Sequence, residues 1–315
     1  MKLVSYYHPQ KRAIRGGWLH AGQVYDLEQT YCHLCEMRGE EVAPPVTLLD
    51  FLCLKENHKR WLYDFAVQGP VPMLKSISLD QTTLRAPVQQ PPGFRDFYAF
   101  EEHVKTARSN RGLGMIPQWY NFPVFYFSNT QALKGHLEPV EKPAYTNQLD
   151  YELEIGCVIG KEGRDIARRH ALDYIEGFFI INDWSARDVQ REEVKVGLGP
   201  AKAKDFATSM GPYLVTRDEL EAVRKGEHYE LEMKARINGK QLSLGNLNTI
   251  YYSFAQLIER ASDSCTLYPG DVIGSGTVGS GCILELGEET HAWLQKGDFV
   301  ELEVDKLGVL AARIV

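Results

Sequence analysis

The pattern of hydrophobic and polar positions divides the chain into a mixed first part and a strand-rich second part. Residues 2–7 and 23–27 have the composition of short strands, and the glycine pair at 16–17 separates them. Apolar positions at helical spacing follow over residues 46–68, and the polar stretch 55–60 interrupts them. This pattern predicts a small sheet followed by two short helices.

Segments of β character at short spacing dominate the second part of the chain. The expected strands cover residues 151–159, 177–181, 212–215, 229–237 and 299–304. The expected helices lie near residues 96–110, 171–176, 217–224 and 253–262. Together with the first part, these elements predict an α+β protein that is mainly β, with helices around the sheets.

A proline-rich stretch separates the two parts. Residues 86–93 contain three prolines and a glycine, which disfavour both a helix and a central strand. We therefore expect a small N-terminal domain over residues 1–85, a linker over 86–93 and a larger domain over 94–315.

Composition and charge narrow the class of partner. The 315 residues are 44% hydrophobic and carry a formal net charge of -7, so the chain lacks the basic balance that nucleic-acid binding requires. Its apolar runs are shorter than the roughly 20 residues that cross a bilayer, and the first 20 residues lack the pattern of an export signal. The sequence therefore predicts a cytoplasmic protein with a small-molecule partner, without nucleic-acid or membrane binding.

The six cysteines predict neither a disulfide framework nor a zinc site. They are sparse for a chain of this length, and only Cys32 and Cys35 have metal-ligand spacing. A tetrahedral zinc site needs a second pair at similar spacing, which the sequence does not contain. We interpret Cys32 and Cys35 as ordinary thiols at the start of a helix.

An alternating segment places carboxylates together on one strand face. Over residues 150–160, Asp150, Glu152 and Glu154 share a face, and their neighbours lie roughly 6.5–7 Å apart along the backbone, close enough to converge on one cation. The alternative is a solvated acidic face. Because Gly156 and Val158 continue the same face with small or apolar side chains, we expect the acids to border a packed interior.

Two further acids join this set as candidates. Asp183 ends the apolar run 177–181, although it or Asn182 has the alternative role of capping the next helix. Asp96 stands among aromatic residues where a helix is expected to begin, and taken alone it has the character of an N-terminal helix acid. Asp96, Glu152, Glu154 and Asp183 would supply oxygen ligands only, which favours Mg²⁺, Ca²⁺ or Mn²⁺.

A base and several donors accompany these acids. His103 follows Asp96 by seven residues, so a continuous helix would bring both to one face. The alternative for His103 is a surface position on an amphipathic helix. Arg187, Gln190 and Lys204 are candidate oxyanion donors, with ordinary helix-surface polarity as the alternative. The glycine-rich stretch 274–281 lacks a nucleotide-binding fingerprint, and we interpret it as a tight loop that approaches a ligand.

One motif carries a family resemblance. The sequence Asn-Asp-Trp-Ser-Ala-Arg-Asp-Val-Gln at 182–190 resembles the signature of the fumarylacetoacetate hydrolases, and the similarity extends from about residue 94 to the C-terminus. Residues 1–85 resemble the small N-terminal domain of that family more weakly. The resemblance implies a mixed β-roll or β-sandwich catalytic domain, one Mg²⁺, Ca²⁺ or Mn²⁺ ion, a homodimer, and cleavage of a carbon–carbon bond in fumarylacetoacetate or a related acylpyruvate.

The resemblance also implies roles for individual residues. It places metal ligands at Asp96, Glu152, Glu154 and Asp183. It makes His103 the base that activates water, with Glu285 as the acid that orients it. The oxyanion donors would be Arg187, Gln190 and Lys204.

The remaining implied roles concern substrate and a secondary cation. Lys204 and Thr208 would lie near the secondary cation, and the substrate contacts would be Tyr98, Tyr126, Gln190 and Thr277. Arg108 is our choice for a substrate-binding arginine, with Arg111 as the alternative. Val194 departs from the family pattern, because the namesake enzyme has a substrate-contacting tyrosine there, so other β-diketo or 2-oxo acids become candidates.

Three functions remain open at this point. The first is a metal-dependent hydrolase of a β-diketo acid. The second is a decarboxylase, hydratase or isomerase of 2-oxo acids on the same fold. The third is a non-catalytic protein that binds a cation or ligand. The combination of four acids with a histidine and a glutamate favours the hydrolase.

Overall fold

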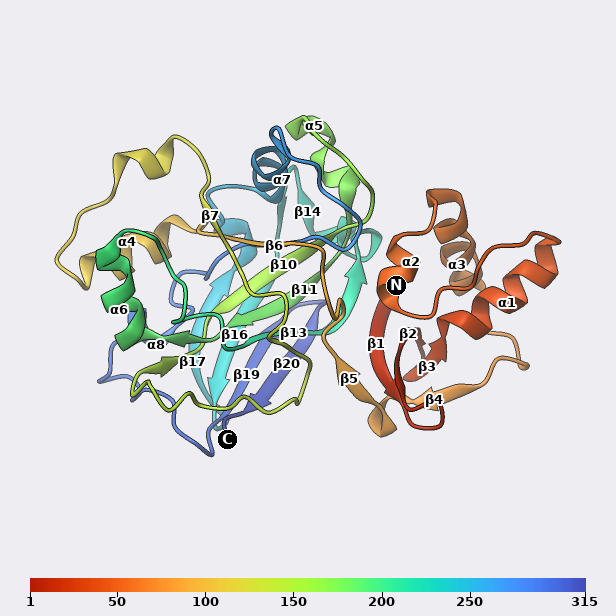
Figure 1. Cartoon of the computed structure of the whole chain (residues 1–315), viewed down its shortest axis with the longest axis horizontal. Coiled ribbons are helices and arrows are strands. Elements are labelled where there is room, and N and C mark those ends of the chain that lie inside the picture. The colour runs from red at the N-terminus through yellow and green to blue at the C-terminus, as the bar shows by residue number, and fades with distance from the viewer.

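The computed structural model describes all 315 residues and shows a large lobe and a smaller N-terminal lobe (Figure 1). The first 85 residues form β1 (Lys2–His8), β2 (Ala13–His20), β3 (Gln23–Asp26), α1 (Leu27–Arg38), α2 (Leu48–Leu52), α3 (Glu56–Gln68), β4 (Ser76–Ser78), the 3₁₀ helix η1 (Leu79–Gln81) and β5 (Thr83–Arg85). The two helices expected over 46–68 are confirmed. Helix α2 begins after Thr47, whose side chain and that of Asp50 form a complete capping box.

The elements that follow belong to the larger lobe. They are β6 (Phe94–Phe97), α4 (Glu101–Ser109), η2 (Pro117–Tyr120), β7 (Phe125–Phe127), β8 (Leu133–Lys134), β9 (Leu149–Asp150), β10 (Leu153–Ile159), α5 (Arg168–Ala171), η3 (Leu172–Tyr174), β11 (Ile175–Asp183), β12 (Ser185–Ala186) and α6 (Arg187–Val196). The rest are β13 (Thr208–Thr216), η4 (Arg217–Val223), β14 (Arg224–Lys225), β15 (His228–Tyr229), β16 (Glu232–Ile237), β17 (Lys240–Asn246), η5 (Leu247–Thr249), α7 (Phe254–Ser262), β18 (Val272–Gly274), α8 (Ile283–Leu286), β19 (Phe299–Val304) and β20 (Gly308–Arg313).

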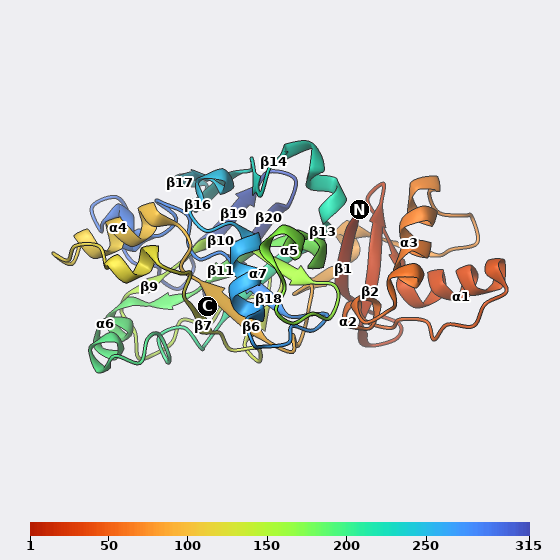
Figure 2. The ribbon, with the colours of Figure 1, turned by 90° about the horizontal axis from the view of Figure 1, so that it is seen from above.

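A twelve-stranded sheet runs through both lobes. Its main path has the order β4-β3-β2-β1-β13-β11-β10-β18-β6-β7, with β5 and β8 paired at its side. The N-terminal lobe joins this sheet where β1 pairs antiparallel with β13. A second sheet, β17-β16-β19-β20, packs beside it (Figures 1 and 2). The expected α+β class with mainly β structure is confirmed, whereas the domain limits at 85 and 94 stay a prediction.

Strand β10 lies in the core and is buried on both faces. Leu153, Ile155 and Cys157 belong to a hydrophobic cluster of 46 buried residues. Val158 belongs to a second cluster of 21 buried residues, which the N-terminal helices complete. The expectation that the acidic face of this strand continues into a packed interior is therefore confirmed.

Three local predictions are wrong. Gly16 and Gly17 lie inside β2 and do not separate two strands. A side chain at Gly16 would collide with Leu27 and with the backbone of Thr47 and Leu48, which explains a glycine there. The helix expected over 96–110 begins only at Glu101, since residues 94–97 form β6 and pair with β18 and β7. The cysteine pair lies in the middle and last turn of α1 and not at its start.

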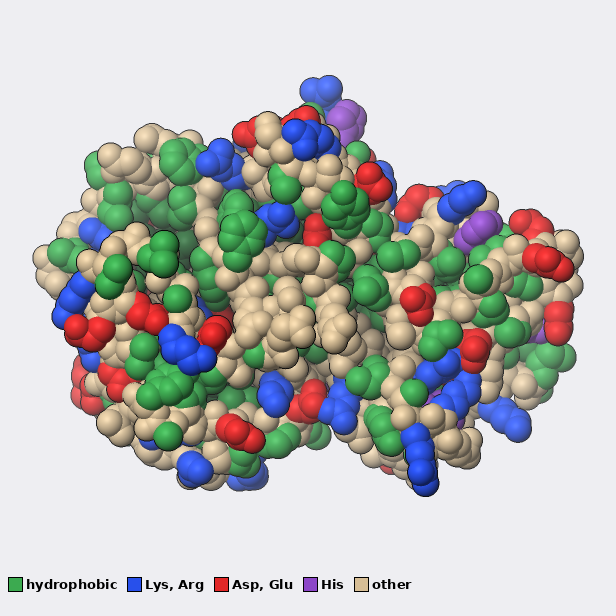
Figure 3. Space-filling view, in the orientation of Figure 1, with side chains coloured by type: hydrophobic (Ala, Val, Ile, Leu, Met, Phe, Trp, Pro, Cys, Tyr) green, Lys and Arg blue, Asp and Glu red, His purple; other side chains and the backbone are tan.

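The charged side chains are spread over the visible surface of the protein. Figure 3 shows acidic and basic side chains mixed over the visible face, without a large patch of one sign. None of the helices has the length and hydrophobicity needed to cross a membrane.

Candidate active site

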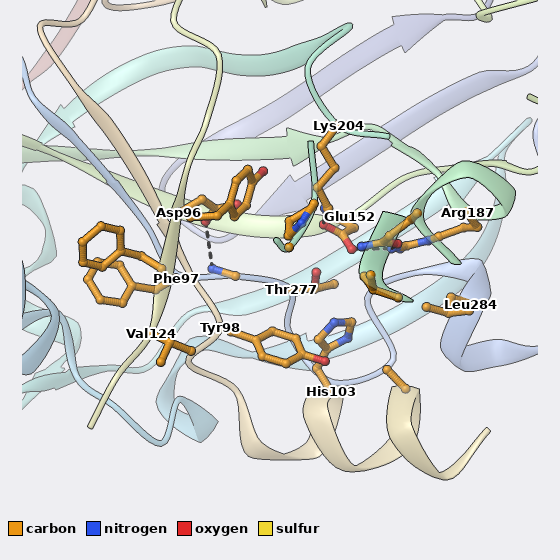
Figure 4. A pocket seen from close by; sticks show the side chains of 18 of the residues that line it. Asp96, Phe97, Tyr98, His103, Val124, Glu152, Arg187, Lys204, Thr277 and Leu284 are labelled. Atoms are coloured by element: carbon orange, nitrogen blue, oxygen red, sulfur yellow. Dashed lines mark hydrogen bonds and ion pairs between the residues drawn. The ribbon is translucent and has the colours of Figure 1, made fainter. Parts of the chain in front are cut away.

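A cavity of about 390 Å³ lies in the larger lobe, and elements far apart in the sequence form its wall. Strands β6 and β10 supply acids at its base, α4 supplies His103, and α6 supplies Arg187 and Gln190. Figure 4 shows Glu152, Arg187 and Lys204 on one side of this cavity and His103 and Tyr98 on the other.

Three carboxylates converge at the base of the cavity. Ligand oxygens of Asp96, Glu154 and Asp183 lie within 4.8 Å of one another, and all three residues are buried. They come from β6, β10 and β11. In the main sheet β10 pairs with β11, and β18 lies between β10 and β6. Asp183 ends β11 and does not cap the next helix, because α6 begins only at Arg187 with Ala186 as its N-cap.

Neighbouring groups hold these carboxylates in place. Asp183 accepts hydrogen bonds from Tyr126 Oη at 2.6 Å and Thr208 Oγ1 at 3.3 Å, and it pairs with Lys204 Nζ at 2.5 Å. Glu154 Oε1 accepts from Thr277 Oγ1 at 3.2 Å. The acids are therefore positioned by fixed partners rather than by chance proximity.

The electrostatics of the three acids favour a bound cation. Burial and then the charge of Asp183 raise the pKa of Asp96 well above its usual value, and burial and then Asp96 do the same for the pKa of Glu154. Glu154 Oε2 is buried and has no hydrogen-bond partner. A buried, unpartnered carboxylate oxygen is costly, and a hard divalent cation with oxygen ligands would remove this cost. The residues present therefore fit a divalent cation.

Glu152 occupies a different position from the other three acids. Its carboxylate pairs with Lys204 Nζ and lies 2.8 Å from Arg187 Nη2. Burial alone would raise its pKa, but the charges of Lys204, Arg187 and His103 outweigh this effect and lower the pKa of Glu152 to about 2. The structure thus places Glu152 beside the acidic triad, where its ionised carboxylate pairs with the side chains of Lys204 and Arg187.

Arg187 is fixed by Asp150, an acid on β9 for which the sequence predicted no role. Asp150 Oδ2 accepts from Arg187 Nε at 2.8 Å, and the same carboxylate accepts the backbone N–H groups of Ile283 and Leu284. Arg187 Nη1 donates to Gln190 Oε1 at 3.0 Å. Nη2 is close to Glu152 but lacks a well-directed hydrogen bond, so it has donor capacity to spare.

His103 and Glu285 form a buried pair at the opposite wall. His103 Nδ1 lies 2.5 Å from Glu285 Oε1, and the two side chains are 5% and 2% exposed. Glu285 Oε2 accepts the backbone N–H of Ser280 at 3.0 Å, which orients the carboxylate. The ring of Tyr98 meets the imidazole edge to face, with centroids 5.3 Å apart. His103 is therefore not a solvated surface histidine.

The structure brings most of the expected residues to one cavity. Those that line it are Asp96, Tyr98, His103, Tyr126, Glu152, Glu154, Arg187, Gln190, Lys204 and Thr277, together with Val194. Arg108 does not line it, because its Nε donates to the carbonyl of Gly114 outside the cavity, whereas Arg111 does line it. The expectation that helix periodicity joins Asp96 to His103 is wrong, since Asp96 lies on β6 and only the fold brings the two together.

A mixed β fold with buried acids facing a histidine in one cavity is the arrangement of an enzyme that acts on a small molecule. Residues 93–315 match the family described as fumarylacetoacetate (FAA) hydrolase C-terminal. The chain belongs to this family, as its sequence resemblance indicated.

The names of similar proteins include both tautomerases and a hydrolase. The chain is 29% identical over 301 residues to the oxaloacetate tautomerase YisK of Bacillus subtilis, covering 93% of each chain. It is 28% identical over 280 residues to the mitochondrial oxaloacetate tautomerase Fahd2a of Rattus norvegicus, covering 87% of this chain and 81% of the other. The maleylpyruvate hydrolase of Sphingobium sp. SYK-6, solved with manganese(II) and pyruvate, superposes with a TM-score of 0.71 at 22% identity, covering 100% and 99%.

Proposed function

We propose that the protein is a metal-dependent hydrolase that cleaves a carbon–carbon bond in a β-diketo acid such as fumarylacetoacetate or a related acylpyruvate. The observation that carries the proposal is the buried pair of His103 and Glu285, because its histidine lines the same cavity as Asp96 and Glu154 of the acidic triad. A histidine oriented by a carboxylate is suited to take a proton from water, and hydrolysis requires that step.

Asp96, Glu154 and Asp183 would hold the cation, with Glu152 as the fourth acid beside them. Their oxygen-only set favours Mg²⁺, Ca²⁺ or Mn²⁺, and the manganese in the maleylpyruvate hydrolase supports the same choice. A divalent cation bound there supplies Lewis-acid polarisation of the diketo oxygens.

The remaining catalytic roles, those of the base and of the oxyanion donors, belong to side chains of this protein. Hydrogen bonding of His103 Nδ1 to Glu285 leaves Nε2 as the base that removes a proton from water. The hydroxyl oxygen then attacks a carbonyl carbon, and donors of Arg187, Gln190 and Lys204 stabilise the oxyanion. The carbon–carbon bond breaks, its electrons pass to the departing enolate, and the proton that His103 accepted returns to the leaving carbon. The products are two acids.

The substrate contacts are part of the same proposal. Tyr98, Tyr126, Gln190 and Thr277 line the cavity, and Arg111 supplies a cation at its wall in place of Arg108. The apolar side chains of Val124, Val194 and Leu198 lie in the same wall. The cavity therefore suits an acid with one charged end and a partly apolar remainder. A homodimer in the cytoplasm stays a prediction.

A second candidate function is tautomerisation of a 2-oxo acid such as oxaloacetate. It is favoured by two relatives that match 93% and 87% of the chain, since both are named oxaloacetate tautomerases. In that reaction His103 would move a proton between carbon and oxygen without consuming water. A decarboxylase or isomerase would use the same cavity.

An assay of purified protein with Mn²⁺ separates these functions. Acylpyruvates and oxaloacetate would be supplied in parallel, with acid products measured by chromatography and enol content by ultraviolet absorbance. The hydrolase gives two acids from an acylpyruvate, and His103→Ala lowers this rate by about 10²-fold or more. The exposed His170 provides the matched control, His170→Ala, which keeps the rate.

Other outcomes would point elsewhere. Enol conversion of oxaloacetate without acid products from any acylpyruvate would replace the hydrolase with the tautomerase. Metal binding without turnover of any compound would support a non-catalytic role. Full hydrolytic activity in His103→Ala would show that His103 is not the base.

A further inference from the structure

A second group of metal-ligand side chains lies behind the imidazole of His103. His103, Cys282 and Glu285 each place one ligand atom within 4.8 Å of the other two. Cys282 Sγ lies 3.5 Å from Glu285 Oε1, and His103 Nδ1 lies 2.5 Å from the same oxygen. Cys282 has no part in the function proposed above, so its position beside the pair needs its own account.

The donor set of this group differs in kind from that of the acidic triad. It combines an imidazole nitrogen, a sulfur and one carboxylate oxygen, which is a set that favours Zn²⁺ and other thiophilic ions. The triad offers oxygen only and favours Mg²⁺, Ca²⁺ or Mn²⁺. We propose that His103, Cys282 and Glu285 form a second, inhibitory metal site that takes a thiophilic divalent cation such as Zn²⁺ or Cd²⁺.

The spacing of the ligand atoms suits such an ion. With zinc bonds of about 2.3 Å to sulfur and about 2.0 Å to nitrogen or oxygen, tetrahedral ligands lie about 3.5 Å (sulfur to oxygen) and about 3.3 Å (nitrogen to oxygen) apart. The distance from Cys282 Sγ to Glu285 Oε1 already has this value. The gap between His103 Nδ1 and Glu285 Oε1 is 2.5 Å and must widen by about 0.8 Å.

The Cys282 thiol is buried, and its one side-chain hydrogen bond goes to Glu285, a member of the same group. Cys282 stands at the N-cap of α8 but makes no side-chain capping bond, so the helix does not depend on its sulfur. His103 lines the cavity, and its imidazole is the member of this group that the cavity reaches. Glu285 Oε2 stays fixed by the backbone of Ser280 while Oε1 faces the site.

Binding at this site would disable the pair without emptying the triad. The ion displaces the proton of the Cys282 thiol and the proton on His103 Nδ1, and both go to solvent. Thiolate and carboxylate together balance the charge of a divalent cation. The bond between His103 and Glu285 is then lost. The inhibitory effect rests on the proposed function, whereas the binding itself does not.

Cadmium binding tests the site without an activity assay. Protein carrying Cys32→Ser and Cys35→Ser, which removes the one pair of cysteines with metal-ligand spacing, is titrated with Cd²⁺ in excess Mg²⁺ while the cadmium–thiolate charge-transfer absorption is followed. One equivalent of Cd²⁺ is expected to give this absorption. Adding Cys282→Ser is expected to abolish it, because serine keeps the size of the side chain and removes the thiolate.

Zinc inhibition gives the second readout. Loss of even an indirect partner weakens metal binding by about 10–100-fold, so Cys282→Ser should raise the inhibitory Zn²⁺ concentration at least as much while leaving the basal rate unchanged. Cys282→Ala serves as a second variant, and circular dichroism verifies that each is folded. Cadmium absorption that survives in Cys282→Ser, or zinc inhibition that Mg²⁺ relieves equally in both proteins, would overturn the proposal.

Discussion

His103 Nδ1 lies 2.5 Å from Glu285 Oε1 although the two residues are 182 positions apart in the chain. Helices α4 and α8 bring them together, and the pair is shielded from solvent. In the proposed reaction the carboxylate holds the imidazole and stabilises its protonated form. The role of the pair can therefore be tested by substituting Glu285 while His103 is left unchanged.

Glu285→Gln is expected to lower kcat by about 10²-fold or more while changing KM less, because glutamine keeps the shape but cannot stabilise an imidazolium. Steady-state kinetics on the best acylpyruvate checks this result. Glu288→Gln, an exposed glutamate on the same segment, is the matched control and should keep the wild-type rate. An equal loss of rate in both variants would contradict the role of Glu285.

A second prediction concerns Glu154 and the cation. Mn²⁺ at 100 times its dissociation constant should stabilise the wild type by about 2.7 kcal/mol, and Glu154→Gln should lose most of this gain. Because burial and then the charge of Asp96 raise the pKa of Glu154, the neutral side chain of glutamine should not destabilise the metal-free protein. Thermal unfolding with Mn²⁺ and with a chelator measures both effects.

The exposed Glu102 on α4 provides the control for this experiment. Glu102→Gln should retain the full Mn²⁺ shift, since its side chain does not line the cavity. A wild-type shift in Glu154→Gln would mean that the cation binds elsewhere.

A third prediction tests the close approach of β18 to the acids. Gly274 pairs with Asp96, and a Cβ at this glycine would collide with Asp96 Oδ1. Gly274→Ala is therefore expected to displace the carboxylate and weaken Mn²⁺ binding about tenfold or more, within the range seen when the support of a metal ligand is lost. Isothermal titration calorimetry measures the affinity. Gly114→Ala, at a glycine with open space around it, should bind Mn²⁺ as the wild type does.

Local pattern was sufficient for the acids that lie on single strands. Alternation along residues 150–160 predicted a strand face with Glu154 on it and an interior beyond it, and Glu154 does lie on β10, whereas Glu152 precedes that strand. Asp183 was found because it ends a run of apolar residues, and β11 does end there. These inferences need only the period of a strand and the burial of its neighbours.

Local sequence pattern could not predict which residues from different helices and strands lie close together in the fold. Residues 94–97 have aromatic and charged side chains that also suit the start of a helix, and their strand conformation depends on pairing with β18 and β7, whose residues are distant in sequence. The choice between Arg108 and Arg111 likewise depended on the position of the chain beyond the end of α4, where Arg111 lines the cavity. The same limitation hid the contact of Cys282 with Glu285, although the two residues are only three apart.

The N-terminal lobe offers a prediction about pH. Asp26 and Arg15 form a buried pair, and Asp26 also caps α1 by accepting from the backbone N–H of Gln29. Burial alone would raise the pKa of Asp26, but the hydrogen bonds from Arg15 and Gln29 outweigh it and lower the pKa. A lowered pKa in the folded state means that the ionised form stabilises the fold above the unfolded value of about 3.9. This contribution is lost as the pH falls through the folded value.

Asp26→Asn should therefore destabilise the protein by about 3 kcal/mol at pH 7, because it removes one partner of a buried pair while asparagine still caps the helix. The difference from the wild type should persist down to about pH 5 and shrink as the pH falls below about 4. Urea unfolding at several pH values measures this difference. Asp64→Asn, at an exposed aspartate on α3, should stay within about 0.5 kcal/mol throughout. A gap between Asp26→Asn and the wild type that is as large at pH 3 as at pH 7 would assign the effect to packing rather than to the charge of Asp26.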